Sequence, residues 1–182
     1  GIFEDRDVRA FHRDSDGTIY AGGKREDGPW LAPLLENAGQ LSRGEEIVFP
    51  AEAQQRSVRG VTSFAAGHQL ALLEGNCLFR IDNGVASEVV IDWDDPRTTD
   101  VEGPPGGSST CSGEPTSDNL RYVYGRQGVA WVGGGPYAFR VVGRRAERVS
   151  LPEQAKIDAI GVGCADTGRL GGRVQEREGG QR

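Results

Sequence analysis

The residues best suited to chemistry are three carboxylates around one tryptophan. Asp92, Asp94 and Asp95 flank Trp93 within four consecutive positions. Carboxylate oxygens are the ligands that Ca²⁺ prefers, and a pair of carboxyl groups can act as general acid and general base. The alternative, which we favour, is a solvated acidic loop that follows a strand. If the protein is an enzyme, these three aspartates are its predicted catalytic residues.

A second acidic pair precedes a glycine. Asp14 and Asp16 stand just before Gly17, a pattern that matches half of a calcium-binding loop. The bidentate Glu that completes such a loop is missing downstream, so a tight turn is the better interpretation. Asp14, Asp16 and Asp94 are therefore weak metal candidates. We expect no cofactor, with Ca²⁺ as the alternative.

Other motifs of catalytic sites are missing from the sequence. The two histidines, His12 and His68, stand beside or within predicted turns, and no Cys or His lies near them at zinc-ligand spacing. The chain has no G-x-S-x-G nucleophile elbow and no phosphate-binding P-loop. These patterns favour binding over catalysis.

Three arginines form the first predicted ligand-binding group. Arg140, Arg144 and Arg148 fall on one predicted hairpin, and strand alternation puts Arg140 and Arg144 on one face, with Arg148 as a further candidate for that face. Guanidinium groups arranged in this way can bind an acidic ligand through paired hydrogen bonds. The alternative, which we favour, is a solvated sheet edge.

Two tryptophans and one long loop complete the predicted ligand-binding surface. Trp30 and Trp93 fall in or beside loops, where they are candidates for an exposed surface on which sugars stack, although partial burial is the commoner outcome. The stretch from Asp92 to Asn119 is rich in Pro, Gly and Ser, as expected for an exposed insertion that carries function.

Composition limits the classes of partner and compartment. The 182 residues carry a net charge of −6, which argues against binding to nucleic acid or anionic membranes. No apolar run approaches the ~20 residues of a membrane-spanning helix. The chain starts at Gly1 without a methionine, so we expect this end to be a processing site or the edge of a longer chain. For the three cysteines we favour reduced thiols over one disulfide plus one free thiol.

The elements that must position these residues are strands. Three stretches, 8–23, 58–75 and 120–135, repeat the order of apolar strand, turn and apolar strand, and each of them ends in glycine. A second predicted hairpin follows each stretch: 34–36 with 47–49, 78–82 with 89–91, and 137–142 with 149–151. The segment 30–40 also fits helical spacing, but comparison with the later copies favours a strand.

The predicted fold is all-β, with four-stranded antiparallel units that start near Val8, Val58, Leu120 and Ile157. We interpret residues 1–172 as a single domain of about three to four such units and residues 173–182 as a disordered tail. So few units would leave unpaired strand edges, and a β-sandwich is therefore an alternative.

Three motifs resemble known repeats. DGTIYAGG (16–23), LFRIDNG (78–84) and GVAWVGGG (128–135) resemble the β-propeller repeats of the two-component-regulator and kelch-like type. The resemblance implies an incomplete propeller and a sensory or binding domain, often outside the cytoplasm. Unit two departs from the pattern because Ala66-Gly67-His68 replaces the Asp-Gly turn.

Three functions follow as hypotheses. The first is a non-catalytic binding or sensory domain that recognises a protein or carbohydrate ligand through loops at one end of the blades. The second is a carbohydrate-active hydrolase or lyase on the same scaffold. The third is a structural component of a larger assembly, in which other chains complete the open sheet edges.

Overall fold

The fold was examined in a computed structural model, which describes residues 2–93, 108–109, 111, 120–152, 157, 161–162 and 170–171. Within these residues all regular structure is β, apart from one 3-10 turn at Ala51–Ala53, so the all-β prediction is confirmed. The described part of the chain contains no helix that is long and apolar enough to cross a membrane.

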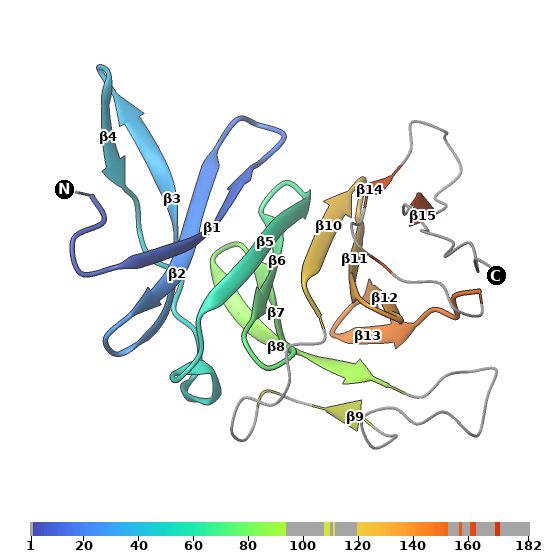
Figure 1. Cartoon of the computed structure of the whole chain (residues 1–182). Helices are drawn as coiled ribbons and strands as arrows, with labels where there is room; N and C mark the ends of the chain where they lie inside the picture. Colours follow the sequence, from blue (N-terminus) through green and yellow to red (C-terminus); the bar gives the residue numbers. More distant parts are fainter. Residues whose placement is uncertain are drawn as a thin grey trace, which may run out of the picture.

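Three antiparallel meanders of four strands follow one another along the chain (Figure 1). The first meander comprises β1 (Asp7–Arg13), β2 (Ile19–Arg25), β3 (Gly28–Asn37) and β4 (Gln40–Arg43). The second comprises β5 (Val58–Ala65), β6 (His68–Leu73), β7 (Cys77–Asp82) and β8 (Val85–Asp92). The third comprises β10 (Tyr122–Arg126), β11 (Val129–Gly134), β12 (Tyr137–Val142) and β13 (Arg145–Arg148).

Three short strands complete the described elements. β9 (Ser108–Ser109) pairs with β8, and β14 (Gly161–Val162) pairs with β15 (Leu170–Gly171). Ile157 forms a single bridge to Gly135. The rest of the predicted fourth unit, the predicted tail and most of the predicted loop lie outside the described residues.

Tight turns determine the residues at which β4 and β13 begin. At the β3–β4 turn Ala38 and Gly39 have φ angles of 51° and 77°, the pair of positive values that a two-residue type I′ hairpin needs. The returning strand therefore starts at once as β4, and its predicted position at 47–49 is wrong. The turn at Gly143 has the same consequence for β13, which was predicted at 149–151. The strand interpretation of 30–40 is confirmed, since β3 extends through most of it.

The second and third meanders join into one nearly closed sheet. β8 and β13 pair in parallel, with Val90 opposite Arg145 and Asp92 opposite Glu147. At the other edge β10 packs against β5, so closely that a Cβ atom on Gly125 would lie 2.6 Å from the carbonyl oxygen of Ser63. The strand order β10-β11-β12-β13-β8-β7-β6-β5 therefore almost returns to its start.

The second meander is buried on both faces. Leu70, Leu72 and Leu78 belong to a core that it shares with the third meander, whose Val132 and Phe139 are fully buried. The side chains that alternate with them belong to a core shared with the first meander; they include Ala71, Leu73, Phe79 and Ile81. Strands buried on both faces need a continuous apolar sequence, which explains the run Leu70–Leu73.

A disulfide joins Cys77 of β7 to Cys111, and both residues are buried. The expectation of three reduced thiols is therefore wrong. Sequence spacing did not indicate the pair, because the two cysteines are 34 residues apart and are brought together by the return of the chain past β7. Cys111 is also anchored by its amide, which donates to the carboxylate of Glu88.

Removal of the disulfide should destabilise the protein substantially. A bridge that closes a loop of this length restricts the unfolded chain by an amount worth about 3–4 kcal/mol. We expect the Cys77→Ala, Cys111→Ala double variant to lose about that much free energy of unfolding in urea titrations. Peptide mapping without reductant should recover the two cysteines in one linked peptide pair, and separate peptides would contradict the assignment.

The close approach of β10 to β5 gives a second prediction. In Gly125→Val the new side chain meets the backbone of Ser63, which cannot move aside, and overpacking of this kind costs about 1–3 kcal/mol. We expect a lower melting temperature for Gly125→Val but not for Arg126→Val, at the exposed next position of the same strand. Equal melting temperatures for the two variants would show that β10 is not seated on β5.

Candidate functional site

Both tryptophans that were predicted to form a stacking surface are buried. Trp30 has no exposed surface, contacts Phe3 and donates from its indole nitrogen to the carbonyl oxygen of Asp7 at 3.3 Å. Trp93 packs edge-on against Tyr137 and Phe139. The prediction of exposure is therefore wrong for both, because each side chain fills space beside a sheet.

The three arginines that were predicted to form one ligand-binding patch do not lie together as one patch. Arg148 donates to the carbonyl oxygen of Trp93 at 2.7 Å, and Arg144 donates to that of Glu88 at 3.3 Å. Both therefore help to attach β13 to β8 and to the residue that follows it. Arg140 pairs with Glu147 across the strands, whereas Arg148 pairs with Phe139, so Arg140 and Arg148 point to opposite faces. The prediction of one shared face is wrong for this pair.

Of the three predicted catalytic aspartates, only Asp92 lies within the described residues. Its carboxylate is 3.2 Å from the Arg145 guanidinium, at the seam between β8 and β13. Asp94 and Asp95 lie outside the described part of the chain.

Asp14 and Asp16 act in the β1–β2 turn. The Asp14 carboxylate accepts from the amide of Ser15, and the Asp16 carboxylate accepts from the amide of Thr18 at 2.8 Å. This backbone hydrogen bond lowers the pKa of Asp16 below its ordinary value. No group of three His, Cys, Asp or Glu side chains among the described residues is arranged to hold a metal ion.

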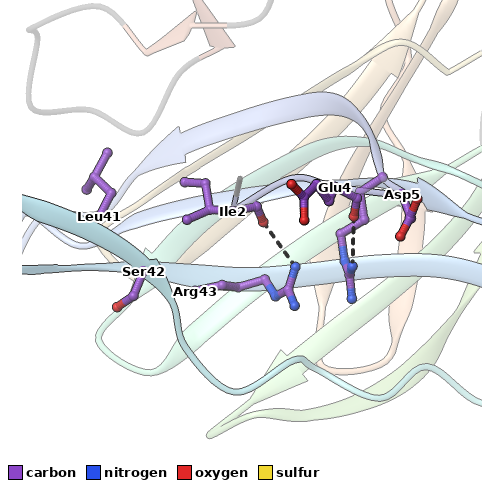
Figure 2. Close-up of a pocket in the computed structure, with 7 residues that line it drawn as sticks. Ile2, Glu4, Asp5, Leu41, Ser42 and Arg43 are labelled. Carbon is purple, nitrogen blue, oxygen red and sulfur yellow. Dashed lines mark hydrogen bonds between the residues drawn. The ribbon is translucent and has the colours of Figure 1, made fainter.

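The wider of the two clefts considered lies at the first meander (Figure 2). It has a volume of about 430 Å³, and its lining includes Arg6, Arg43 and Leu41. Figure 2 shows Arg43 directed at the carbonyl oxygen of Ile2, to which it donates at 3.1 Å. Arg6, Arg25 and Arg43 all contact the carboxylate of Glu46. The cations here hold the first residues against the sheet, so we do not take this cleft as the site.

The second cleft lies between the second and third meanders and is the candidate site. This inter-meander cleft has a volume of about 150 Å³. It is lined by Phe64, Arg80, Gly128, Val129, Ala130, Arg140, Val141, Val142 and Gly143. It lies where β5 and β10 end, and the amide of Gly128 donates to the carbonyl oxygen of Phe64 at 2.5 Å. The cleft is thus formed where the shared core meets the turns.

Arg80 of β7 is held in the wall of this cleft by three contacts. Its Nε lies 2.8 Å from both carboxylate oxygens of Asp82, and its Nη1 donates to the carbonyl oxygen of Gly143 at 3.4 Å. The guanidinium carbon lies 5.1 Å from the centre of the Phe64 ring, a cation–π contact. Among the described residues, Nη2 has no hydrogen-bond partner, which leaves its two N–H groups available to a ligand.

His68 completes the cluster. Its Nδ1 lies 2.5 Å from the Asp82 carboxylate, and its ring stacks on Phe64. Partial burial raises the pKa of Asp82, but the hydrogen bonds from His68 and Arg80 outweigh it and hold the pKa below the ordinary value. Asp82 is therefore an anion at neutral pH that fixes both neighbours. The arrangement can present the oriented guanidinium of Arg80 to a small polar group, while His68 helps to hold Asp82 and Phe64.

Sequence reasoning missed this cluster. Arg80 stands in the motif LFRIDNG, which was interpreted only as part of a repeat, and nothing in that motif indicated that Arg80 reaches the third meander. His68 and Asp82 are 14 residues apart and become neighbours through the register of β6 and β7, which pairs them directly.

His12, the other histidine, has a different role. Its Nε2 accepts a hydrogen bond at 2.9 Å from the amide of Ser63, which links β1 to β5. Next to it, the Gln69 side chain donates to the Tyr20 hydroxyl at 3.2 Å. These two bonds connect the first meander to the second. The imidazole can accept from an amide only while Nε2 is unprotonated.

Comparison of the chain with protein-family models, with curated proteins and with solved structures found no match. What the inter-meander cleft can bind therefore follows from its own geometry.

The His12 contact predicts how stability depends on pH. Desolvation by burial lowers the pKa of His12 below its ordinary value of 6.5, although Asp14 opposes this. The unfolded chain therefore takes up a proton more readily than the folded one. The stabilisation is complete above pH 6.5 and decreases as the pH falls through 6.5 towards the lower folded-state pKa.

Urea unfolding between pH 5 and pH 8 measures this effect. We expect the free energy of unfolding to fall with pH below 6.5 in the native protein and to change less in His12→Gln. The carboxyls of Asp16 and Asp82 do not interfere, because their pKa values lie below 3.8. The same pH dependence in both proteins would exclude His12 as its source.

Proposed function

We propose that this chain is a propeller-type binding domain that has no catalytic activity and recognises its ligand at the end where β1, β5 and β10 terminate. The observation that carries the proposal is the serial stacking of three four-stranded meanders, with the second buried on both faces. Stacked four-stranded sheets are the units of a propeller. β8 and β13 also pair in parallel and so join the second meander to the third, which the stacking of separate sheets does not require.

The order of the strands supports this interpretation. The first strand of each meander lies beside the first strand of the next, since β5 is linked to β1 through His12 and packs against β10 at Gly125. In a propeller the first strands surround the central axis in the same way. The turns that follow β1, β5 and β10 consequently gather at one end, where a propeller binds its ligands through loops.

The chemistry of the cleft supports binding better than catalysis. General acid–base catalysis needs a positioned group that exchanges a proton with the substrate. In the inter-meander cleft the Asp82 carboxylate is already bound by Arg80 and His68, so its role is to orient them. The proposed ligand is a protein or a carbohydrate. The Cys77–Cys111 disulfide supports a location in an oxidising compartment outside the cytoplasm.

Thermal unfolding in the presence of a ligand panel tests the proposal. The panel contains acidic, basic and neutral peptides and acidic and neutral oligosaccharides. A ligand at 100 times its Kd stabilises the folded state by about 2.7 kcal/mol, which corresponds to roughly 5–10 °C for a chain of this size. We expect at least one class to raise the Tm by this amount.

Two substitutions to tryptophan test whether the ligand binds in the inter-meander cleft. Val142→Trp places a bulky ring at the exposed mouth of the inter-meander cleft and should abolish the Tm shift. Leu35→Trp, at an exposed position of the first meander, should preserve it. A panel without any Tm shift, or turnover of one of the oligosaccharides, would contradict a non-catalytic binding domain.

A further inference from the structure

The inter-meander cleft also limits the chemistry of its ligand. We propose that it receives the carboxylate side chain of an acidic residue, Glu or Asp, on a partner protein. This inference rests on the proposed binding function and specifies the group that is recognised.

The available hydrogen-bond donors favour an anion. Nη2 of Arg80 has no partner within the described part of the chain, so its N–H groups can donate to a ligand. This guanidinium is fixed before any ligand arrives, since it is bonded at Nε and Nη1 and lies over the Phe64 ring. A fixed donor loses little side-chain entropy on binding, and a hydrogen bond from a guanidinium to a carboxylate is charge-assisted and therefore stronger than a neutral one.

The balance of charge favours a single negative charge on the ligand. Two arginines, Arg80 and Arg140, line the cleft, and one carboxylate, that of Asp82, neutralises one of these charges. The excess is therefore about one positive charge when Glu147, which lies opposite Arg140 on β13 but does not line the cleft, is left out of the count. A carboxylate balances it, whereas a doubly charged phosphate would bring excess charge into a partly buried site.

The apolar part of the lining accounts for the rest of the ligand. Phe64, Ala130 and Val141 are buried in the cleft wall, and Val142 stands exposed at its mouth. These side chains fit the methylene groups that carry the carboxylate of Glu or Asp. An apolar wall with one fixed cation is the arrangement expected for an acid on a short hydrocarbon stem.

The volume of the cleft decides whether the acid belongs to a protein side chain or to a sugar. A cavity of about 150 Å³ holds a molecule of the size of benzene. The side chain of glutamate is no larger than this. A hexuronic acid has about twice as many non-hydrogen atoms as benzene and would have to leave most of its ring outside. The cleft therefore favours an acidic side chain of a protein over an acidic sugar.

NMR titration of the whole chain tests the proposal with defined probes. N-acetyl-glutamate methylamide provides the carboxylate, N-acetyl-glutamine methylamide provides the neutral isostere, and glucuronate represents the acidic sugar. We expect the glutamate probe to shift the backbone amide signals of Phe64, Gly128 and Gly143 to saturation. The glutamine probe should leave them in place, and glucuronate should bind at least about tenfold more weakly than the glutamate probe.

Arg80→Lys provides the matched variant. A lysine keeps the positive charge next to Asp82 and the stem on Phe64, so the fold is retained, but it loses the Nη2 donor that is proposed to bind the carboxylate. We expect it to weaken binding of the glutamate probe by about tenfold. Arg13→Lys, the same change at an exposed position of β1, should bind as the native protein does.

Each other outcome overturns the inference in a distinct way. Equal shifts with the glutamine probe would show that charge is not recognised, and tighter binding of glucuronate would assign the cleft to acidic sugars. Undiminished binding by Arg80→Lys, or an absence of shifts at the cleft, would exclude Arg80 as the receptor of the carboxylate. Any of these results leaves the binding function standing if a panel ligand still raises the Tm. The binding function itself fails only in the panel experiment.

Discussion

Burial of both faces of the second meander is the constraint on which the rest of the structure depends. Alternate residues of β6 and β7 point into two different cores, so that Leu72 packs towards the third meander and Leu73 towards the first. Neither neighbour can be removed without exposing one of these faces to water. The stacking of the meanders is therefore a consequence of hydrophobic burial, and their relative positions determine which polar groups can meet.

The charged residues near these cores serve mainly to join the meanders. Arg144, Arg145 and Arg148 attach β13 to β8 and Trp93, and the carboxylate of Glu46 holds three arginines of the first meander. In these places a guanidinium satisfies a backbone carbonyl or a carboxylate that the packing would otherwise leave without a partner. Arginine supplies nearly all the basic side chains of the sequence, and its several donors suit this task.

The inter-meander cleft exists because the apolar layer between two meanders stops before the turns begin. Beyond Phe64 the side chains on this face of the second meander are His68, Arg80 and Asp82, which bond to one another. On the opposite wall the chain runs through Gly128 and Gly143, which have no side chains to fill the space. The result is a small opening with a fixed cation, held by residues that also stabilise the interface.

The local pattern of the sequence was sufficient to predict the strands and several turns. The Asp-Gly and Asn-Gly pairs at 16–17 and 83–84 have preferences that depend on their own backbone, and the hairpins form where these pairs predicted them. Burial, however, depends on which residues lie close together in the fold, and these are often far apart in the sequence. The sequence did not reveal that Trp30 and Trp93 lie inside, that Cys77 meets Cys111, or that β13 runs parallel to β8. The same holds for the candidate site, because the register of β6 and β7 joins His68 to Asp82 and only the packing of one meander on another puts Arg80 beside Gly143.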